Sequence, residues 1–97
     1  MIQSNSIMET NTIFIGKKPV MNYVLAGLFL IQNGVDEMTI KARGKSISKA
    51  VDMAQIITKR FATDVINKDI NITTEQVKSI ETNNLNNVSS MEIQLTE

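Results

Sequence analysis

The alternation of apolar and polar positions along the chain predicts four short strands. Residues 12–15 form a β-branched and aromatic run that stops at Gly16, which is typical of a buried strand. Residues 35–43 alternate, with apolar side chains at the even positions from 38 to 42, and this pattern predicts a strand with one polar face. Two later period-two faces predict a third and a fourth strand, and they consist of Ile66, Ile70, Ile72 and of Met91, Ile93, Leu95.

Two other stretches follow a helical pattern. Residues 19–33 are apolar around most of the helical circumference, so we expect this helix to be buried on more than one side. Pro19 suits its first turn, and Gly34 follows as a left-handed C-cap. Residues 47–61 carry an apolar stripe, which consists of Ile47, Ala50, Val51, Ala54, Ile57, Thr58 and Phe61.

Met53 and Ile56 lie outside the stripe of the second helix. Single apolar residues on a surface are common, but two on one flank also fit a contact with a partner protein. Both interpretations stay open at this point.

The order of the elements, β-α-β-α-β-β, predicts an α+β domain in which two helices cover one face of a small mixed sheet. Residues 73–88 are polar and rich in asparagine, which indicates a long hairpin with a loose tip. Residues 1–11 are polar and irregular, so we expect a flexible N-terminal tail followed by one domain over residues 12–97.

The composition excludes several kinds of chemistry. There is no cysteine and no histidine among the 97 residues, which excludes disulfides, thiolate chemistry, the usual zinc sites and imidazole catalysis. The carboxylates are scattered without a catalytic spacing, so we predict no enzyme, no metal and no cofactor. The longest apolar run, residues 20–31, is shorter than the roughly 20 residues that cross a bilayer, and no membrane partner is expected.

The formal net charge is zero, but the charges are unevenly distributed. Residues 17–60 contain eight Lys and Arg against three Asp and Glu, whereas residues 61–97 contain two against six. Within this basic middle, Lys17 and Lys18 directly precede a helix start, where backbone N–H groups and the helix dipole favour an anion such as phosphate. The local sequence alone favours the alternative, a solvated lysine pair at the end of a strand.

Two motifs change this balance: residues 13–26 read IFIGKKPVMNYVLA, and residues 40–52 read IKARGKSISKAVD. At this separation they closely resemble the Alba family of archaeal chromatin proteins, and the resemblance covers residues 12–97. It implies a fold similar to the C-terminal domain of translation initiation factor three. It also implies a homodimeric architectural protein, cytoplasmic and chromosome-associated, that binds double-stranded DNA and RNA with little sequence preference.

The resemblance also implies the residues of the site. Lys17 and Lys18 match the phosphate-contacting lysines of the family, and one of them matches a position where acetylation weakens binding. Asn22 and Tyr23 flank that site. The second motif contributes its basic residues, Arg43 and Lys45.

Phe61 resembles an aromatic position where one family dimer meets the next, although it also ends an apolar stripe and fits the core. With Met53 and Ile56 it completes the candidate interface residues.

The hairpin departs from the family pattern. Relatives carry several cations there, whereas residues 73–90 contain only Lys78, beside Glu75 and Glu81. We therefore expect weaker binding than in basic relatives. The alternative function is an RNA-binding subunit of a ribonucleoprotein complex, with the flank of Met53 and Ile56 contacting a protein.

Overall fold

The computed structural model describes residues 11–97, so the expected N-terminal tail, apart from Asn11, lies outside the described residues. The elements follow the predicted order and confirm the α+β class. They are β1 (Thr12–Phe14), α1 (Val20–Gln32), β2 (Glu37–Arg43), α2 (Ile47–Ile56), β3 (Ile66–Lys78) and β4 (Leu85–Thr96). A 3₁₀ turn, Gly44–Ser46, precedes α2, and a π-helical turn, Ile57–Phe61, continues it. In the part of the chain described, no helix is both long enough and apolar enough to span a bilayer.

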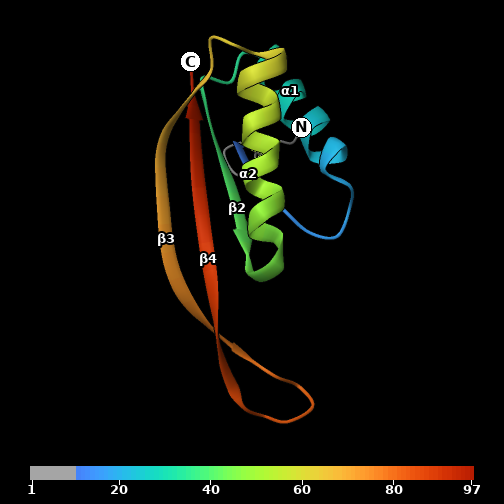
Figure 1. Cartoon of the computed structure of the whole chain (residues 1–97), viewed down its shortest axis with the longest axis vertical. Helices are drawn as coiled ribbons and strands as arrows, with labels where there is room; N and C mark the ends of the chain where they lie inside the picture. Colours follow the sequence, from blue (N-terminus) through green and yellow to red (C-terminus); the bar gives the residue numbers. More distant parts are fainter. Residues whose placement is uncertain (1–10) are drawn as a thin grey trace, which may run out of the picture.

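The strands form one mixed sheet in the order β1-β2-β4-β3. β1 is parallel to β2, since α1 carries the chain back across the sheet, and the other neighbours are antiparallel. Figure 1 shows both helices on one side of the strands, with β3 and β4 continuing past the body. This projecting part, residues 73–90, is called the arm below.

The core lies between the sheet and the helices. The side chains of β2 and β4 that face the helices are almost inaccessible, as Ile40, Ile93 and Leu95 illustrate. α1 approaches α2 closely at Gly27, where a Cβ atom would lie only 2.8 Å from the Cδ1 of Ile57. A larger residue there would push the two helices apart.

Met53 belongs to this core, so its prediction as an exposed partner contact is wrong. It is fully buried, and its methyl group lies 3.1 Å from the position of a Cβ at Gly27. The physical reason is that α2 packs on the sheet with one side and on α1 with another, so its buried surface is wider than a single stripe. Ile56 is half-buried against the same core, whereas Val51, assigned to the stripe, is 40% exposed.

α1 begins and ends within one residue of the predicted bounds, and Gly34 adopts the left-handed φ of 85° expected after it. The prediction that α1 is buried on more than one side is wrong for the single chain. Met21, Leu25 and Phe29 form an exposed stripe along its outer side, because α2 and the π-helical turn cover only its inner side.

A bulge at Lys68 alters the predicted face of β3. Before the bulge Ile66 lies opposite Thr96, and after it Ile70 lies opposite Ile93. Since one extra residue reverses the side to which the following residues point, Ile66 faces the other side of the sheet from Ile70. The expected common face of the three isoleucines is therefore wrong for Ile66.

The arm is more regular than the sequence indicates. Strand pairing continues as far as Lys78 opposite Leu85, and the tip is confined to residues 79–84, with Asn83 at a positive φ of 61°. Asn86 and Asn87 belong to the asparagine-rich stretch from which a loose tip is predicted, but they are paired residues of β4. Polar residues suit both strands because both faces of the arm are in contact with water.

Candidate nucleic-acid interface

The lysine loop, residues 15–19, joins β1 to α1 and carries Lys17 and Lys18, whose side chains are exposed. Pro19 occupies the N-cap of α1, and its carbonyl oxygen accepts a hydrogen bond of 3.0 Å from the N–H of Asn22. The two lysines therefore lie just before a helix N-terminus, as predicted. Asn22, in the first turn, is exposed beside them.

Tyr23 shapes the backbone of the lysine loop. Its hydroxyl oxygen accepts hydrogen bonds from the N–H groups of Gly16, at 2.9 Å, and of Lys18, at 3.2 Å. A Cβ atom at position 16 would lie 3.3 Å from this oxygen, so a glycine leaves room for the contact. The phenol thus satisfies the two amides on either side of Lys17.

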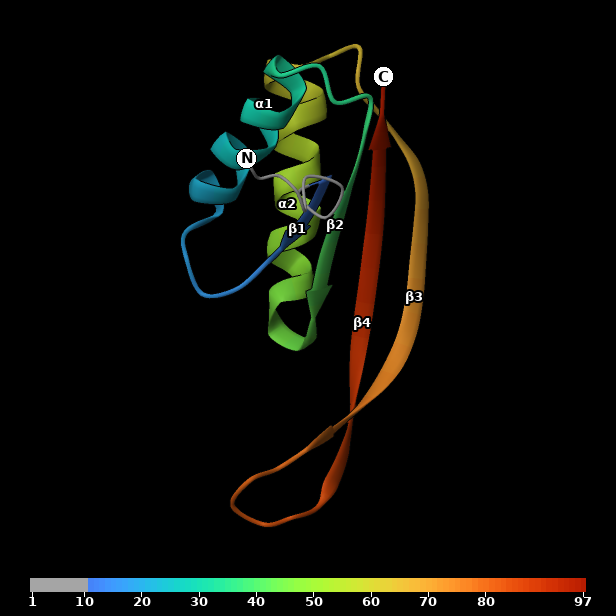
Figure 2. The same ribbon diagram turned by 180° about the vertical axis from the view of Figure 1, so that it is seen from behind.

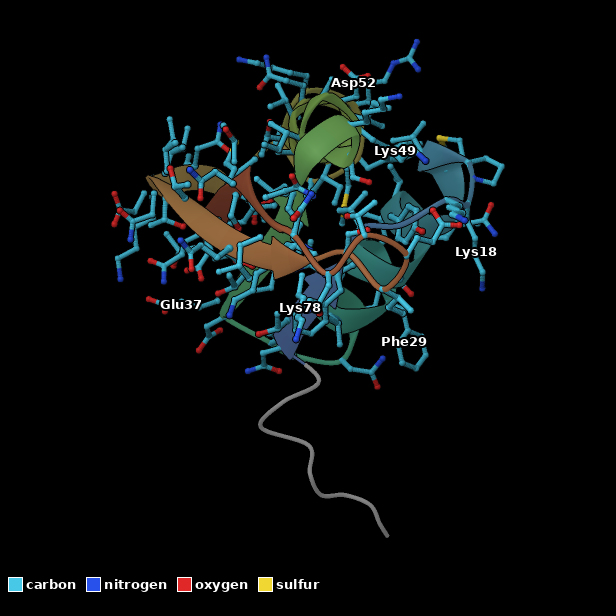
Figure 3. All side chains as sticks on the ribbon, turned by 90° about the horizontal axis from the view of Figure 1, so that it is seen from below. Lys18, Phe29, Glu37, Lys49, Asp52 and Lys78 are labelled. Atoms are coloured by element: carbon cyan, nitrogen blue, oxygen red, sulfur yellow. The ribbon has the colours of Figure 1, made fainter. Side chains whose placement is uncertain are left out.

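Lys49 holds the same loop from α2, a role that sequence reasoning missed. Its Nζ donates hydrogen bonds to the carbonyl oxygens of Gly16, at 2.9 Å, and of Lys18, at 2.6 Å. Figure 3 shows Lys49 extending toward the loop that carries Lys18. One signal was present: Lys49 lies in the first turn of α2, where the helix dipole disfavours a cation unless its side chain has acceptors elsewhere.

Arg43 and Lys45 lie where the chain turns from β2 into α2. Gly44 has a φ of 59°, which permits this reversal at little cost. Figures 1 and 2 show this turn and the lysine loop at the end of the body from which the arm projects. The structure therefore brings Lys17 and Lys18 of the first motif and Arg43 and Lys45 of the second to the same end of the body.

The guanidinium group of Arg43 already has a carboxylate partner. Its Nη1 lies 3.2 Å from Oε1 of Glu75 on β3, so the side chain crosses β4 to reach the arm. Next to it, Nζ of Lys41 lies 3.3 Å from Oε2 of Glu92 and 5.8 Å from the ring centroid of Phe14.

Together these ion pairs line a groove of about 350 Å³ on the face of the sheet opposite the helices. A phosphate entering this groove competes with a carboxylate for each cation. The sequence suggested low cation content in the hairpin but gave no sign of this pairing across β4.

Lys78 is not brought together with the lysine loop. It lies at the end of β3 on the arm, and Figure 3 places it well apart from Lys18. Phe61 ends the π-helical turn with 54% of its surface exposed, so the interpretation as a core residue is wrong. Its proposed role between dimers stays a prediction.

These features define a small α+β domain with a rigidly held cationic loop at the start of a helix. The model of the Alba family matches residues 11–82. DNA/RNA-binding protein Alba 1 of Archaeoglobus fulgidus is 52% identical over 90 residues, which cover 93% of this chain and 99% of the relative. DNA/RNA-binding protein Alba of Methanocella arvoryzae is 53% identical over 85 residues, 88% of each chain. The chain belongs to the Alba family.

Solved structures agree with this assignment. Alba from Thermoplasma volcanium superposes with a TM-score of 0.84 at 45% identity, covering 89% of this chain and 99% of that one. ALBA1 from Trypanosoma brucei has a TM-score of 0.73 at 20% identity, covering 91% and 69% respectively, and shows the fold alone.

Proposed function

We propose that this chain binds double-stranded DNA, and also RNA, through phosphate contacts and with little sequence specificity. The observation that carries the proposal is the lysine loop, where two exposed lysines precede a helix N-terminus and the backbone is held by Tyr23 and Lys49. Relatives that are about 50% identical are DNA/RNA-binding proteins by name, which supports the same ligand here. Phosphate contacts fix the position of a protein on a duplex but read no sequence.

The proposed phosphate contacts fall into two groups, according to whether the cation already has a carboxylate partner. Lys17, Lys18 and Lys45 form no ion pair in the described part of the chain, so they contribute fully. Arg43 contributes after it leaves Glu75, and Lys78 adds a single charge from the arm. Acetylation of Lys17 or Lys18 would remove one cation and with it one phosphate contact.

We further propose that the functional unit is a homodimer that organises the chromosome. Ile70 and Ile72 point to the helix side of the sheet but are 53% and 69% exposed, because α2 packs over β2 and β4 and leaves β3 uncovered. Their exposed side chains form an apolar surface that a second copy would cover, and we propose that Val51 of α2, which is 40% exposed, contributes to the same contact. Pairing two chains also doubles the number of lysine loops available to one duplex. Phe61 is proposed as a contact between such dimers.

The dimer is tested by sedimentation of the double variant Ile70→Lys, Ile72→Lys. We expect monomers at micromolar concentration, where the unsubstituted chain sediments as a dimer, because charges would be buried without partners. Ile80→Lys is the matched control, since Ile80 is 99% exposed at the tip of the arm. A monomeric unsubstituted chain would reject the dimer, and a dimeric double variant would reject this surface.

Binding is tested by titrations with duplex DNA, single-stranded RNA and folded RNA across a salt series. We expect similar affinities for duplexes of unrelated sequence and a linear fall of log affinity with log salt. Absence of binding to all three nucleic acids would reject the proposal. Markedly tighter binding to folded RNA at equal salt would favour the ribonucleoprotein alternative, although burial of Met53 removes half of the flank on which that alternative depended.

A further inference from the structure

The backbone on either side of Lys17 is held entirely by two side chains. Tyr23 accepts hydrogen bonds from the N–H groups of Gly16 and Lys18, and Lys49 donates hydrogen bonds to the carbonyl oxygens of the same two residues. All four backbone polar groups of the residues that flank Lys17 are therefore satisfied within the chain. The loop is short and irregular, yet these four groups are paired as they would be in a strand.

The two holding side chains are also coupled to each other. Nζ of Lys49 lies 5.9 Å from the ring centroid of Tyr23, within the range of a cation–π contact. A lysine ammonium has three donors and no acceptor, which suits it to bridging two carbonyl oxygens. Because Lys49 is on α2 and Tyr23 is on α1, the loop is fixed relative to both helices of the body.

We propose that Lys49 is a positioning residue, which fixes the lysine loop in the free protein and thereby aims Lys17 and Lys18 at successive phosphates. Ordering a mobile loop on binding costs conformational entropy, and a loop that is already ordered avoids this cost. Lys49 acts through the backbone of the loop, since both of its hydrogen bonds end on loop carbonyls. The inference rests on the proposed function, because it concerns the same nucleic-acid site.

The first test compares three variants by their affinity for duplex DNA. Lys49→Met keeps the aliphatic stem without donors, and we expect a loss of about tenfold at low salt, with a salt slope reduced by no more than about two contacts. Lys49→Arg restores donors for both carbonyl oxygens and should recover most of the affinity. Lys59→Met is the matched control, because Lys59 is exposed on the π-helical turn and has no ion pair in the described region. It should lose at most one contact.

The second test separates positioning from a direct phosphate contact. In the background of Lys17→Ala with Lys18→Ala, the substitution Lys49→Met should weaken binding by less than about twofold, because the two lysine side chains that Lys49 positions are then absent. An equal loss in both backgrounds would mean that Lys49 contacts phosphate itself, and that result would overturn the inference.

The third test needs no nucleic acid. In the free protein, Lys49→Met should speed hydrogen exchange at the amides of Gly16 and Lys18 at least tenfold and leave the amides of β2 and β4 unchanged. Tyr23→Phe, which removes the acceptor of these two amides and keeps the ring, is the positive control for their faster exchange, and Lys49→Gln serves as the second variant if Lys49→Met does not fold. Unchanged exchange at both amides would overturn the inference. A chain that binds neither DNA nor RNA would reject the proposed function, while the exchange result would still report on the loop.

Discussion

The backbone conformations of the lysine loop and of the arm are stabilised by different interactions. The loop has no regular structure and depends on hydrogen bonds from Tyr23 and Lys49, so single side chains decide its shape. The arm depends on a continuous backbone ladder between β3 and β4, which any residue compatible with an extended chain can join. The chemistry of the loop is therefore restricted, whereas the charges of the arm can change without changing the fold. This contrast explains how a chain can keep both family motifs and yet carry a nearly neutral arm.

The largest effect should come from Lys17→Ala combined with Lys18→Ala. Both side chains are exposed, so the melting temperature should stay unchanged, while affinity for every duplex falls by about 100-fold at low salt and the salt slope falls by about two contacts per chain. Thermal unfolding and titrations with two unrelated duplexes measure this. A loss confined to one duplex sequence, or a parallel loss of stability, would contradict the importance given to the loop.

A smaller and opposite effect is expected from Glu75→Gln. Removing this carboxylate frees the guanidinium of Arg43, so binding should tighten by about threefold to tenfold and the salt slope should steepen by about one contact. Glu81→Gln makes the same charge change at the tip, where Glu81 has no ion pair in residues 11–97. Equal gains for the two variants would show that the overall charge of the arm matters and the pairing with Arg43 does not.

Lys78→Ala should have a weaker effect than either change. The arm offers one cation beside two carboxylates, so we expect a loss of less than about threefold and a change in slope of less than about one contact. The same titration series measures it. A loss as large as that of the loop variant would show that the arm binds the duplex by more than its charge.

The smallest effect is expected from Lys68→Met. Lys68 lies near the start of β3, and Figure 1 shows that β3 starts at the end of the body away from the arm. Its ammonium donates a hydrogen bond of 2.8 Å to Oε2 of Glu37, and this contact raises the pKa of Lys68. A raised pKa stabilises the fold below the ordinary lysine value, and the contribution disappears as pH rises through the folded value. Melting curves should therefore show a slight loss at neutral pH and none at strongly alkaline pH, with DNA binding unchanged at neutral pH. A changed affinity would place Lys68 in the interface.

Much of the fold follows from residue patterns because each element buries one consistent face. Residues 35–43 alternate as a strand does when only one of its faces meets a core, and β2 occupies most of that range. The pattern fails where burial depends on neighbours far along the chain. The helical pattern of α2 places Met53 outside the apolar stripe, yet Met53 is buried. The pattern does not show that α1 covers a second side of α2.

The site shows the same limit. The sequence indicates which cations are present but not which of them form ion pairs with a carboxylate of the same chain. Glu75 lies 32 residues from Arg43, and a bulge in β3 sets which side chains of the strand reach the groove. The role of Lys49 likewise cannot be derived from composition. A lysine in the first turn of a helix was nevertheless a physical signal that its ammonium has hydrogen-bond acceptors elsewhere.

The strand order has a consequence for how the chain acquires its structure during synthesis. β4 is made after every other element, yet it occupies the interior of the sheet between β2 and β3 and contributes Ile93 and Leu95 to the core. Until β4 has been synthesised, β2 keeps an open hydrogen-bonding edge and the helices have only part of a surface on which to pack. A nascent chain that ends within the arm therefore cannot complete its core. Folding is expected to proceed in one late step, in which the β3–β4 hairpin docks as a unit and closes the domain.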